Sequence, residues 1–397
     1  MRSLSRLSRR RFLAGSSAFG AAAVLSACGL DSARNRQPVA TNALSVVNWT
    51  EYIDGPTVNR AQIDLGIPLL EYRDLLPSGD PVYPDNATGF STIIEPQLSG
   101  GGTPDFDIIV PTNWLAGRMI QNGWVEELPL ELITNHVNID PAFLTNDWDR
   151  GSRFQMPWQA GITGIAYNPS LVQQDVTSVD VLFDEGLRGQ VGLVGEMREA
   201  VGLAMLLNGD DPSRPTAASA RSGLELIRSS AQAGQFGAVV FDDFVGRLQD
   251  GSLAASMAWS GQAAALALED DRFEYVIPEE GGISWFDTMV IARNAENYEN
   301  AARWMNWAYD PVNAAEISLF NLYVCPVLGT QDALRAMGGE AAELAENPLV
   351  FPDAETRNRL FTWGPLDLEV EEEIEAEFDD LVFGGALFDP DSLDFIG

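Results

Sequence analysis

Short runs of apolar residues alternate along the chain with longer segments in which apolar positions recur every three or four residues. The short runs predict buried strands and lie at 44–49, 107–110, 163–167, 191–194, 254–259 and 288–292. The longer segments predict amphipathic helices, most clearly at 201–207, 224–233, 301–308 and 313–319. Because strands and helices alternate, the pattern predicts an α/β fold.

Three further segments stand out. Near the C-terminus, apolar residues recur at helical spacing beneath a row of glutamates, at Val370, Ile374, Phe378 and Leu381. This spacing predicts an amphipathic helix whose acidic face is in solvent. Trp304 and Trp307 fall within a predicted helix and are expected in the core. The stretch 74–89 is rich in Pro, Asp and Gly and predicts a loop insertion.

Residues 1–27 have the pattern of an export signal. Arginines precede a short apolar run, and the stretch 8–13 (Ser-Arg-Arg-Arg-Phe-Leu) has the pattern of a twin-arginine signal. The run ends in Leu-Ser-Ala directly before Cys28, which predicts cleavage there and lipidation of this cysteine. A polar tether over 28–43 would follow. We therefore expect a lipid anchor on the outer side of the cytoplasmic membrane, in a periplasm or at the cell surface.

The formal net charge is −34, and all 24 basic residues are arginine. This excess of acid excludes a basic nucleic-acid-binding face. A negative field attracts cationic ligands, but adaptation to salt or a GC-rich genome would give the same composition. The positions of individual carboxylates are therefore more informative than their number.

Residues for metal or covalent chemistry are scarce. The single histidine, His136, stands among Thr and Asn residues and is expected in a surface loop. Zinc spacings, nucleophile elbows and dinucleotide fingerprints do not occur, so we expect no metal, no cofactor and no enzymatic activity. With only Cys28 and Cys325, no internal disulfide is expected. A hydrolase that uses carboxylates alone, as glycosidases do, is an alternative from the enzyme class.

Aromatic and acidic residues gather at the ends of the predicted strands. They are residues 48–52, Thr112, Trp114, Glu196, Glu199, Trp259, Trp285 and Asp287. In open α/β sheets ligands bind beyond the carboxyl ends of strands, so these side chains are expected to converge on one cleft.

Rings and carboxylates together suit an alkyl polyamine. Methylene spacers need apolar walls, and an ammonium group over a Trp or Tyr ring gains about 0.5–2 kcal/mol. Charge-assisted hydrogen bonds to carboxylates are roughly twice as strong as neutral ones. Another cationic solute would need the same groups. An interaction lipoprotein without a small ligand is a further alternative.

In these segments the sequence resembles the polyamine-binding (spermidine/putrescine) proteins of ABC transporters, from about 44 to 363. The strongest segments are 48–52, 196–199, 279–287 and 351–356. The resemblance implies a two-lobed, type II-like periplasmic-binding fold, each lobe a mixed sheet flanked by helices, with the ligand cleft between the lobes. It also implies a monomer that captures spermidine or putrescine and delivers it to the permease subunits of an ABC importer.

The resemblance further implies a set of ligand-binding residues. They are Trp49, Thr50, Glu51, Tyr52, Thr112, Trp114, Glu196, Glu199, Asp243, Trp259, Trp285, Asp287 and Tyr323. Glu199 matches the acid that binds a terminal amine. The chain departs from the pattern at Glu196 (usually Asp), Trp114 (Tyr), Asp243 (near a position that is often Ser) and Gly364 (Gln). These departures leave open which polyamine or other diamine binds.

The same comparison predicts lobe boundaries. The first lobe is expected to comprise 44–162 and 288–330, and the second 163–287 and 331–397. The chain would cross between them near 158–164 and 284–288.

Overall fold

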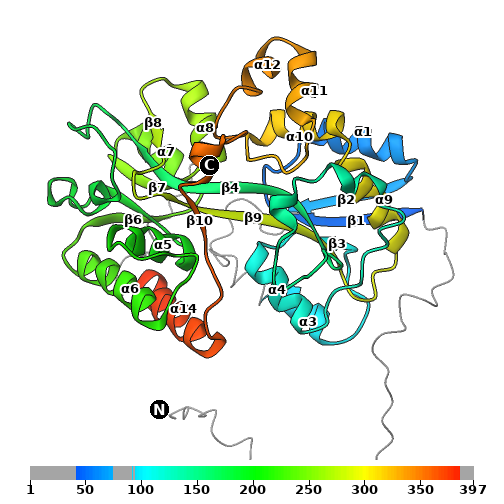
Figure 1. The fold of residues 1–397 in the computed structure, drawn as a ribbon, viewed down its shortest axis with the longest axis horizontal. Helices are drawn as coiled ribbons and strands as arrows, with labels where there is room; N and C mark the ends of the chain where they lie inside the picture. Colours follow the sequence, from blue (N-terminus) through cyan, green and yellow to red (C-terminus); the bar gives the residue numbers. More distant parts are fainter. Residues whose placement is uncertain (1–41, 75–91, 93, 385–397) are drawn as a thin grey trace, which may run out of the picture. The chain divides into compact units, whose positions relative to one another are not determined.

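The computed structural model describes residues 42–74, 92 and 94–384. Its strands are β1 (Ala43–Asn48), β2 (Leu69–Asp74), β3 (Ile108–Ile109), β4 (Gln155–Tyr167), β5 (Val191–Val194), β6 (Phe236–Val240), β7 (Ala255–Trp259), β8 (Glu274–Val276), β9 (Gly282–Ile291) and β10 (Leu360–Thr362) (Figure 1). All belong to one sheet, in the order β2-β1-β3-β9-β4-β7-β5-β6, with β10 beside β9 and β8 beside β4. The predicted Cys28 anchor, the tether and nearly all of the 74–89 insertion lie outside the described residues.

The helices precede and follow these strands on both halves of the sheet. They are α1 (Gly55–Leu65), α3 (Glu95–Ser99), α4 (Asn113–Gln121), α5 (Met197–Leu207), α6 (Ala217–Gln232), α7 (Phe244–Asp250), α8 (Ser260–Glu269), α9 (Tyr298–Ala308), α10 (Pro311–Asn321), α11 (Thr330–Met337), α12 (Glu340–Leu344), α13 (Ala354–Arg357) and α14 (Leu368–Phe383). Short 3₁₀ helices occupy 134–138, 141–144, 179–183 and 185–187. The described part of the chain contains no helix long and apolar enough to cross a bilayer. The predicted α/β fold is confirmed.

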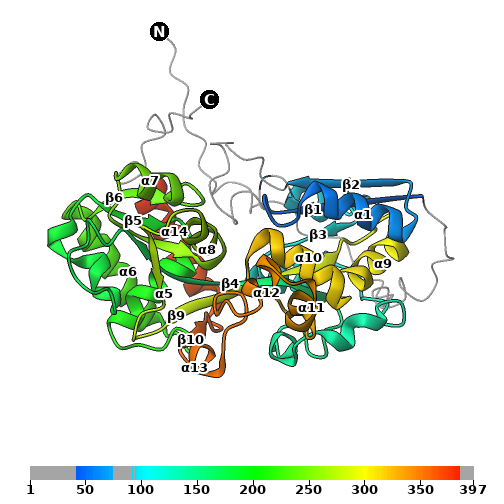
Figure 2. The same ribbon diagram turned by 90° about the horizontal axis from the view of Figure 1, so that it is seen from above.

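Two long strands join the two halves of the sheet. One end of β4 pairs with β9 in antiparallel register, from Gln155 opposite Val290 onward, and its other end pairs with β7 and β8. All 13 residues of β4 are buried, because structure covers both faces of the strand. The sequence pattern predicted only 163–167 as strand, since the preceding residues mix Gln, Pro and Gly with apolar residues. Figure 2 shows β4 and β9 running between the two groups of helices.

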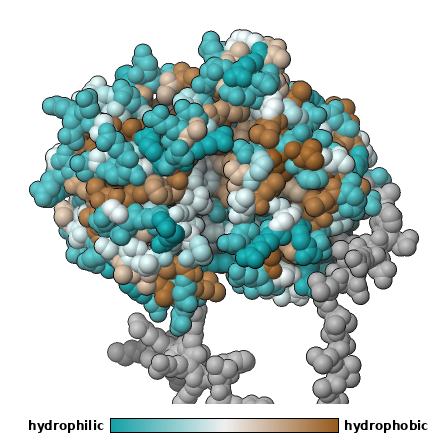
Figure 3. Space-filling model, viewed as in Figure 1, coloured by the Kyte–Doolittle hydropathy of each residue, from teal (hydrophilic) through white to brown (hydrophobic). Residues whose placement is uncertain are grey.

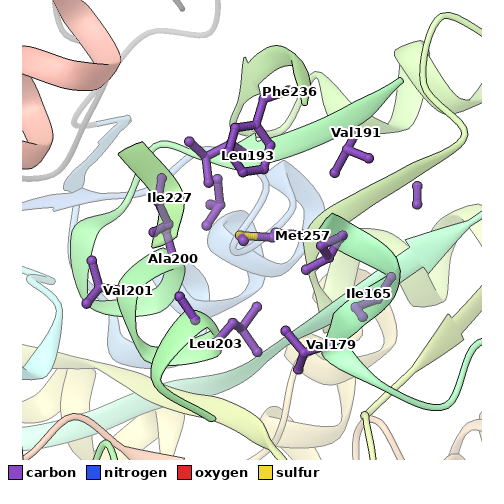
Figure 4. Close-up of a cluster of buried hydrophobic side chains, with 14 of the residues drawn as sticks. Ile165, Val179, Val191, Leu193, Ala200, Val201, Leu203, Ile227, Phe236 and Met257 are labelled. Carbon is purple, nitrogen blue, oxygen red and sulfur yellow. The ribbon is translucent and has the colours of Figure 1, made fainter. Parts of the chain in front are cut away.

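Two large clusters of buried side chains pack on the two halves of the sheet. The first core contains residues of β1, β3 and α9, among them Val46, Ile108 and Trp304. The second core contains residues of β5, β7 and α5, among them Leu193 and Met257, both labelled in Figure 4. Trp304 is fully buried and Trp307 is 6% exposed, as predicted. The surface drawn in Figure 3 is hollowed between the left and right halves of the view.

The predicted amphipathic helix is α14, and its apolar residues Ile374 and Phe378 are buried in the second core. The prediction that its glutamates face solvent is wrong for two of them. The side chains of Glu371 and Glu375 are only 14% and 13% exposed, because both are paired with Arg198. His136 is half-buried in the 3₁₀ helix at 134–138, and not in an open loop.

Helices α11 and α12 form a small cluster with α10, in which Ala315 packs with Leu334 and Leu344. Helix α10 also packs against α9 of the first core. The prediction that the first lobe ends at 330 stays a prediction.

Candidate functional site

Most of the predicted ligand residues follow a strand at its carboxyl end. Strands β1 and β3 are parallel in the first half of the sheet, and β5, β6 and β7 are parallel in the second. Parallel strands bring the residues that follow them to the same edge of the sheet. Trp49 and Tyr52 follow β1, Thr112 follows β3, and Glu199 follows β5.

Asp287 lies on β9 and is 1% exposed. The Tyr52 hydroxyl donates to its carboxylate at 2.6 Å, and Thr112 forms an isolated bridge with the Asp287 backbone. Burial raises the pKa of Asp287 to about 7, although the hydrogen bonds from Tyr52 and Thr112 lower it. The predicted residues Tyr52, Thr112 and Asp287 therefore form one group.

Glu199 lies in the first turn of α5 and is 8% exposed. Its Oε2 accepts hydrogen bonds from the Thr163 hydroxyl and from the Trp259 indole N–H, the latter at 2.6 Å. The Trp285 indole N–H donates to the same Thr163 hydroxyl at 3.0 Å. Burial raises the pKa of Glu199 to about 7, the two hydrogen bonds lower it, and nearby Asp287 raises it further.

Four aromatic rings connect these two acids. The centroid of Tyr323 is 5.6 Å from that of Tyr52 and 5.6 Å from that of Trp285, and Trp285 is 6.4 Å from Trp259. Each contact is edge-to-face, the arrangement that the quadrupoles of aromatic rings favour. The Trp285 ring covers Gly161 so closely that a Cβ there would lie 2.2 Å from it. Glycine on β4 is therefore required for the position of this ring.

A third acid, Asp242, reaches Tyr323 through Gln262. The Tyr323 hydroxyl donates to the Gln262 carbonyl oxygen, and the Gln262 amide donates to Asp242 at 2.7 Å. Desolvation, together with the charges of Glu51 and Asp243, raises the pKa of Asp242 to about 6. The residue is nevertheless exposed to solvent, so this acid is less desolvated than Asp287 or Glu199.

The three acids surround Tyr323. Burial raises the pKa of Tyr323 well above its ordinary value, and the charges of Asp242, Asp287 and Glu199 raise it further. In the part of the chain that the structure describes, no arginine lies within ion-pair distance of any of the three. The same residues contain no group of three or more potential metal ligands. Converging carboxylates without a resident cation are costly, which favours a ligand that brings its own positive charges.

The other predicted residues near β1 and β5 lie close by. Trp49 is half-buried against the first core, and its indole N–H is buried without a partner among the described residues. Thr50 lies in the turn that follows, and Glu51 is exposed with a φ of 60°. Glu196 is the N-cap residue of α5 and is 9% exposed.

Two predicted residues have partners elsewhere in the protein. The Arg198 guanidinium lies 3.7 Å from the centroid of the Trp114 ring, and that of Arg118 lies at 4.8 Å. Asp243 accepts from the Arg247 side chain at 2.6 Å, four residues along α7. The structure therefore does not join Trp114 or Asp243 to the group around Tyr323.

Three residues in the site were not predicted from the sequence. Asp242 is adjacent to the predicted Asp243, so the sequence offers the same signal for both. Gln262 follows Trp259 at the start of α8, a position that offered a signal because helix starts after strands commonly face ligands. Thr163 lies inside β4, and nothing in its neighbourhood distinguishes it from other buried strand residues.

The fold and the site define a two-lobed binding protein, with rings and carboxylates where the halves of the sheet meet. The family of bacterial extracellular solute-binding proteins matches residues 88–349, and the chain belongs to that family. It is therefore a binding protein and not an enzyme, and the hydrolase alternative is dropped.

Individual relatives agree with this assignment. The chain is 25% identical over 340 residues to spermidine/putrescine-binding periplasmic protein 1 of Haemophilus influenzae, covering 84% of this chain and 88% of that protein. It is 26% identical over 321 residues to the spermidine/putrescine-binding periplasmic protein of Escherichia coli, covering 79% and 84%. A solved ABC-transporter structure from Listeria monocytogenes superimposes with a TM-score of 0.73 at 25% identity, covering 85% of this chain and 98% of that one.

Proposed function

We propose that this protein is the substrate-binding component of an ABC importer and that it captures a polyamine such as spermidine or putrescine. The main observation in support is that Asp242, Glu199 and Asp287 converge on Tyr323 without an arginine partner among the described residues. Rings at 5.6–6.4 Å spacing supply walls for the methylene chain. The names of the Haemophilus and Escherichia relatives support the same ligand class.

Each group has a role in this proposal. Asp287 and Glu199 bind ammonium groups in buried positions, and Asp242 binds one nearer to solvent. The faces of Trp259, Trp285 and Tyr323 contact the methylene spacers, and the cation–π term adds about 0.5–2 kcal/mol per ammonium. Trp49, Thr50, Glu51 and Glu196 would complete the wall, as the resemblance to polyamine-binding proteins implies.

Calorimetry of the signal-free protein with spermidine, putrescine, spermine and cadaverine tests the proposal. We expect at least one of the four to bind with submillimolar affinity. Another cationic solute is the second candidate, and a set of guanidines and quaternary amines in the same experiment distinguishes it. Absence of binding to all four polyamines would overturn the polyamine assignment.

We propose further that residues 1–27 direct export, that Cys28 carries the lipid anchor, and that the monomeric protein passes its ligand to the permease. Support comes from the signal pattern and from relatives named as periplasmic proteins. The lobes would be 44–162 with 288–330, and 163–287 with 331–397. Mass spectrometry of the N-terminal peptide tests lipidation, and Cys28→Ala is expected to release the protein from the membrane.

Asp242→Asn is expected to weaken polyamine binding about tenfold or more, because it removes one of the carboxylates around Tyr323. Asp271→Asn is the matched control, since it makes the same change in an exposed carboxylate outside the group around Tyr323. Calorimetry on both variants measures the difference. Equal losses in the two variants would contradict the assignment of Asp242 to the site.

Gly161→Ala is expected to reduce affinity at least about tenfold, because the new methyl group displaces the Trp285 ring from the site. Gly246→Ala on α7 is the control, since its Cβ would meet no atom within 4 Å. Near-ultraviolet circular dichroism reports the movement of the tryptophan independently of binding. Unchanged affinity in Gly161→Ala would show that Trp285 does not contact the ligand.

A further inference from the structure

Trp114 already has cationic partners within the protein. The Arg198 guanidinium carbon lies 3.7 Å from the ring centroid, inside the range of about 6 Å over which cation–π attraction acts. Arg118, one turn along α4 from Trp114, lies at 4.8 Å from the same centroid. The ring is therefore occupied by cations of the protein itself.

Both arginines also bind one carboxylate. Glu375 on α14 accepts from Arg198 at 2.9 Å and from Arg118 at 3.0 Å, and Arg198 additionally binds Glu371 at 2.7 Å. The four side chains are between 7% and 26% exposed. Burial raises the pKa of Glu375, but the charges of Arg198 and Arg118 outweigh it and hold this pKa below the ordinary value.

These residues come from the two halves of the sheet. Helix α4 packs through Leu115 and Met119 with Val47 of β1, on the side of the first core. Helix α14 packs through Ile374 and Phe378 in the second core, beside α5 with Arg198. In Figure 1, α14 (red) lies among the left-hand elements and α4 among the right-hand ones. The contacts of Arg118 with Glu375, and of Trp114 with Arg198, therefore connect one lobe to the other.

We propose that Arg118, Trp114, Arg198 and Glu375 form an interlobe bridge that holds the two lobes together and slows release of the ligand. Opening of the lobes separates Arg118 from Glu375 and Trp114 from Arg198. Arg198 keeps both Glu371 and Glu375 within the second lobe. Arg118, already 26% exposed, keeps the Trp114 ring of its own helix and becomes accessible to water, so no buried charge is left without a partner. The cost of opening is therefore moderate, and the bridge can break and reform in each transport cycle. The part of this inference that concerns release rests on the proposed function.

The bridge is testable without any ligand. Spin labels at Gln121→Cys and Gln232→Cys, both exposed and on opposite lobes, report the interlobe distance in a Cys28→Ser, Cys325→Ser background. We expect a short-distance population in the ligand-free protein that shrinks severalfold when Arg118→Met is added. Identical distance distributions with and without this substitution would overturn the bridge.

Release kinetics test whether the interlobe bridge slows dissociation of the ligand. By stopped-flow displacement of spermidine, Arg118→Met and Glu375→Gln are each expected to raise the dissociation rate constant about tenfold. Arg153→Met is the matched arginine control, because it removes an ion pair with Glu127 and a contact with the Phe154 ring inside one lobe. Glu372→Gln, an exposed residue on α14, is the control for charge. Rates unchanged by Arg118→Met would refute a role in release.

The two experiments separate this inference from the proposed function. If no polyamine binds the unmodified protein, the proposed function fails, and the spin-label distances still decide whether the bridge exists. If polyamines bind but the distances do not respond to Arg118→Met, the bridge fails and the proposed function stands.

Discussion

Asp287→Asn is expected to lower polyamine affinity by about 2–5 kcal/mol, or roughly 30-fold to several thousandfold. Asp287 is 1% exposed and is held by Tyr52, so the neutral variant keeps the shape of the site while losing its charge. A buried ammonium group without a facing carboxylate pays its full desolvation cost. Calorimetry with the tightest-binding polyamine measures the loss.

The same substitution is expected to stabilise the ligand-free protein at pH 8. The folded-state pKa of Asp287 is raised from 3.8 to about 7, so the fold favours its protonated form. The contribution of the protonated Asp287 carboxyl to the free energy of unfolding is largest below about pH 4. It declines as the pH rises and is lost above about pH 7. The gain in unfolding free energy from Asp287→Asn should therefore be about 2–3 kcal/mol larger at pH 8 than at pH 5.

Urea unfolding of both proteins at the two pH values measures this difference. Asp180→Asn, an exposed acid in the 3₁₀ helix at 179–183, is the control and should change neither binding nor the pH dependence of stability. Normal polyamine affinity in Asp287→Asn would show that Asp287 does not bind the ligand. A variant that is equally destabilised at both pH values would instead indicate damage to the fold.

Acidification is expected to weaken polyamine binding about 100-fold between pH 8 and pH 6. The pKa values of Glu199 and Asp287 in the ligand-free protein are about 7, and only the ionised acids attract ammonium groups. A diamine such as putrescine tests this most directly, because its primary amines resemble that of lysine, with a pKa near 10, and its charge is nearly constant over this range. One pH unit below its pKa, each acid reduces affinity about tenfold. Asp242, with a pKa of about 6, extends the loss to lower pH.

Calorimetry in buffers of different ionisation enthalpy measures both the affinity and the number of protons released on binding. We expect proton release near pH 7 and almost none at pH 9. Glu199→Gln removes one titrating acid, so the slope of affinity against pH should be shallower in this variant. An affinity that is constant from pH 6 to pH 8 would show that these acids do not bind the ligand as carboxylates.

The periodicity of apolar residues was sufficient to predict the fold class and the positions of several strands. Runs of Val, Ile and Ala identified β1, β5 and β7 nearly to the residue, because a buried short strand leaves a continuous apolar run. The lengths of β4 and β9, the longest strands, were underestimated from the sequence, because their polar residues are buried by contacts with distant segments. Gln159, for example, is 2% exposed and binds Asn321.

Residue type at strand ends and the family resemblance together predicted Tyr52, Glu199, Trp259, Trp285, Asp287 and Tyr323, which the structure brings into one group. The prediction named Asp243 and not its neighbour Asp242. The difference lies in their partners: Arg247 binds Asp243 one turn along its own helix, whereas Gln262 on α8 connects Asp242 to the site. Partners on other elements cannot be read from local sequence.

The sequence by itself thus determined the fold class, because the periodicity of strands and helices depends on spacing along the chain. The export signal and the ligand chemistry that residue type indicates stay predictions. Only the tertiary structure decided which carboxylates face one another without a cation and which are neutralised. Trp114 shows the reason most clearly. Its position after β3 resembles a ligand contact, yet its ring is occupied by Arg198 from α5, which lies more than 80 residues away in sequence and comes close only because the sheet brings α4 and α5 together.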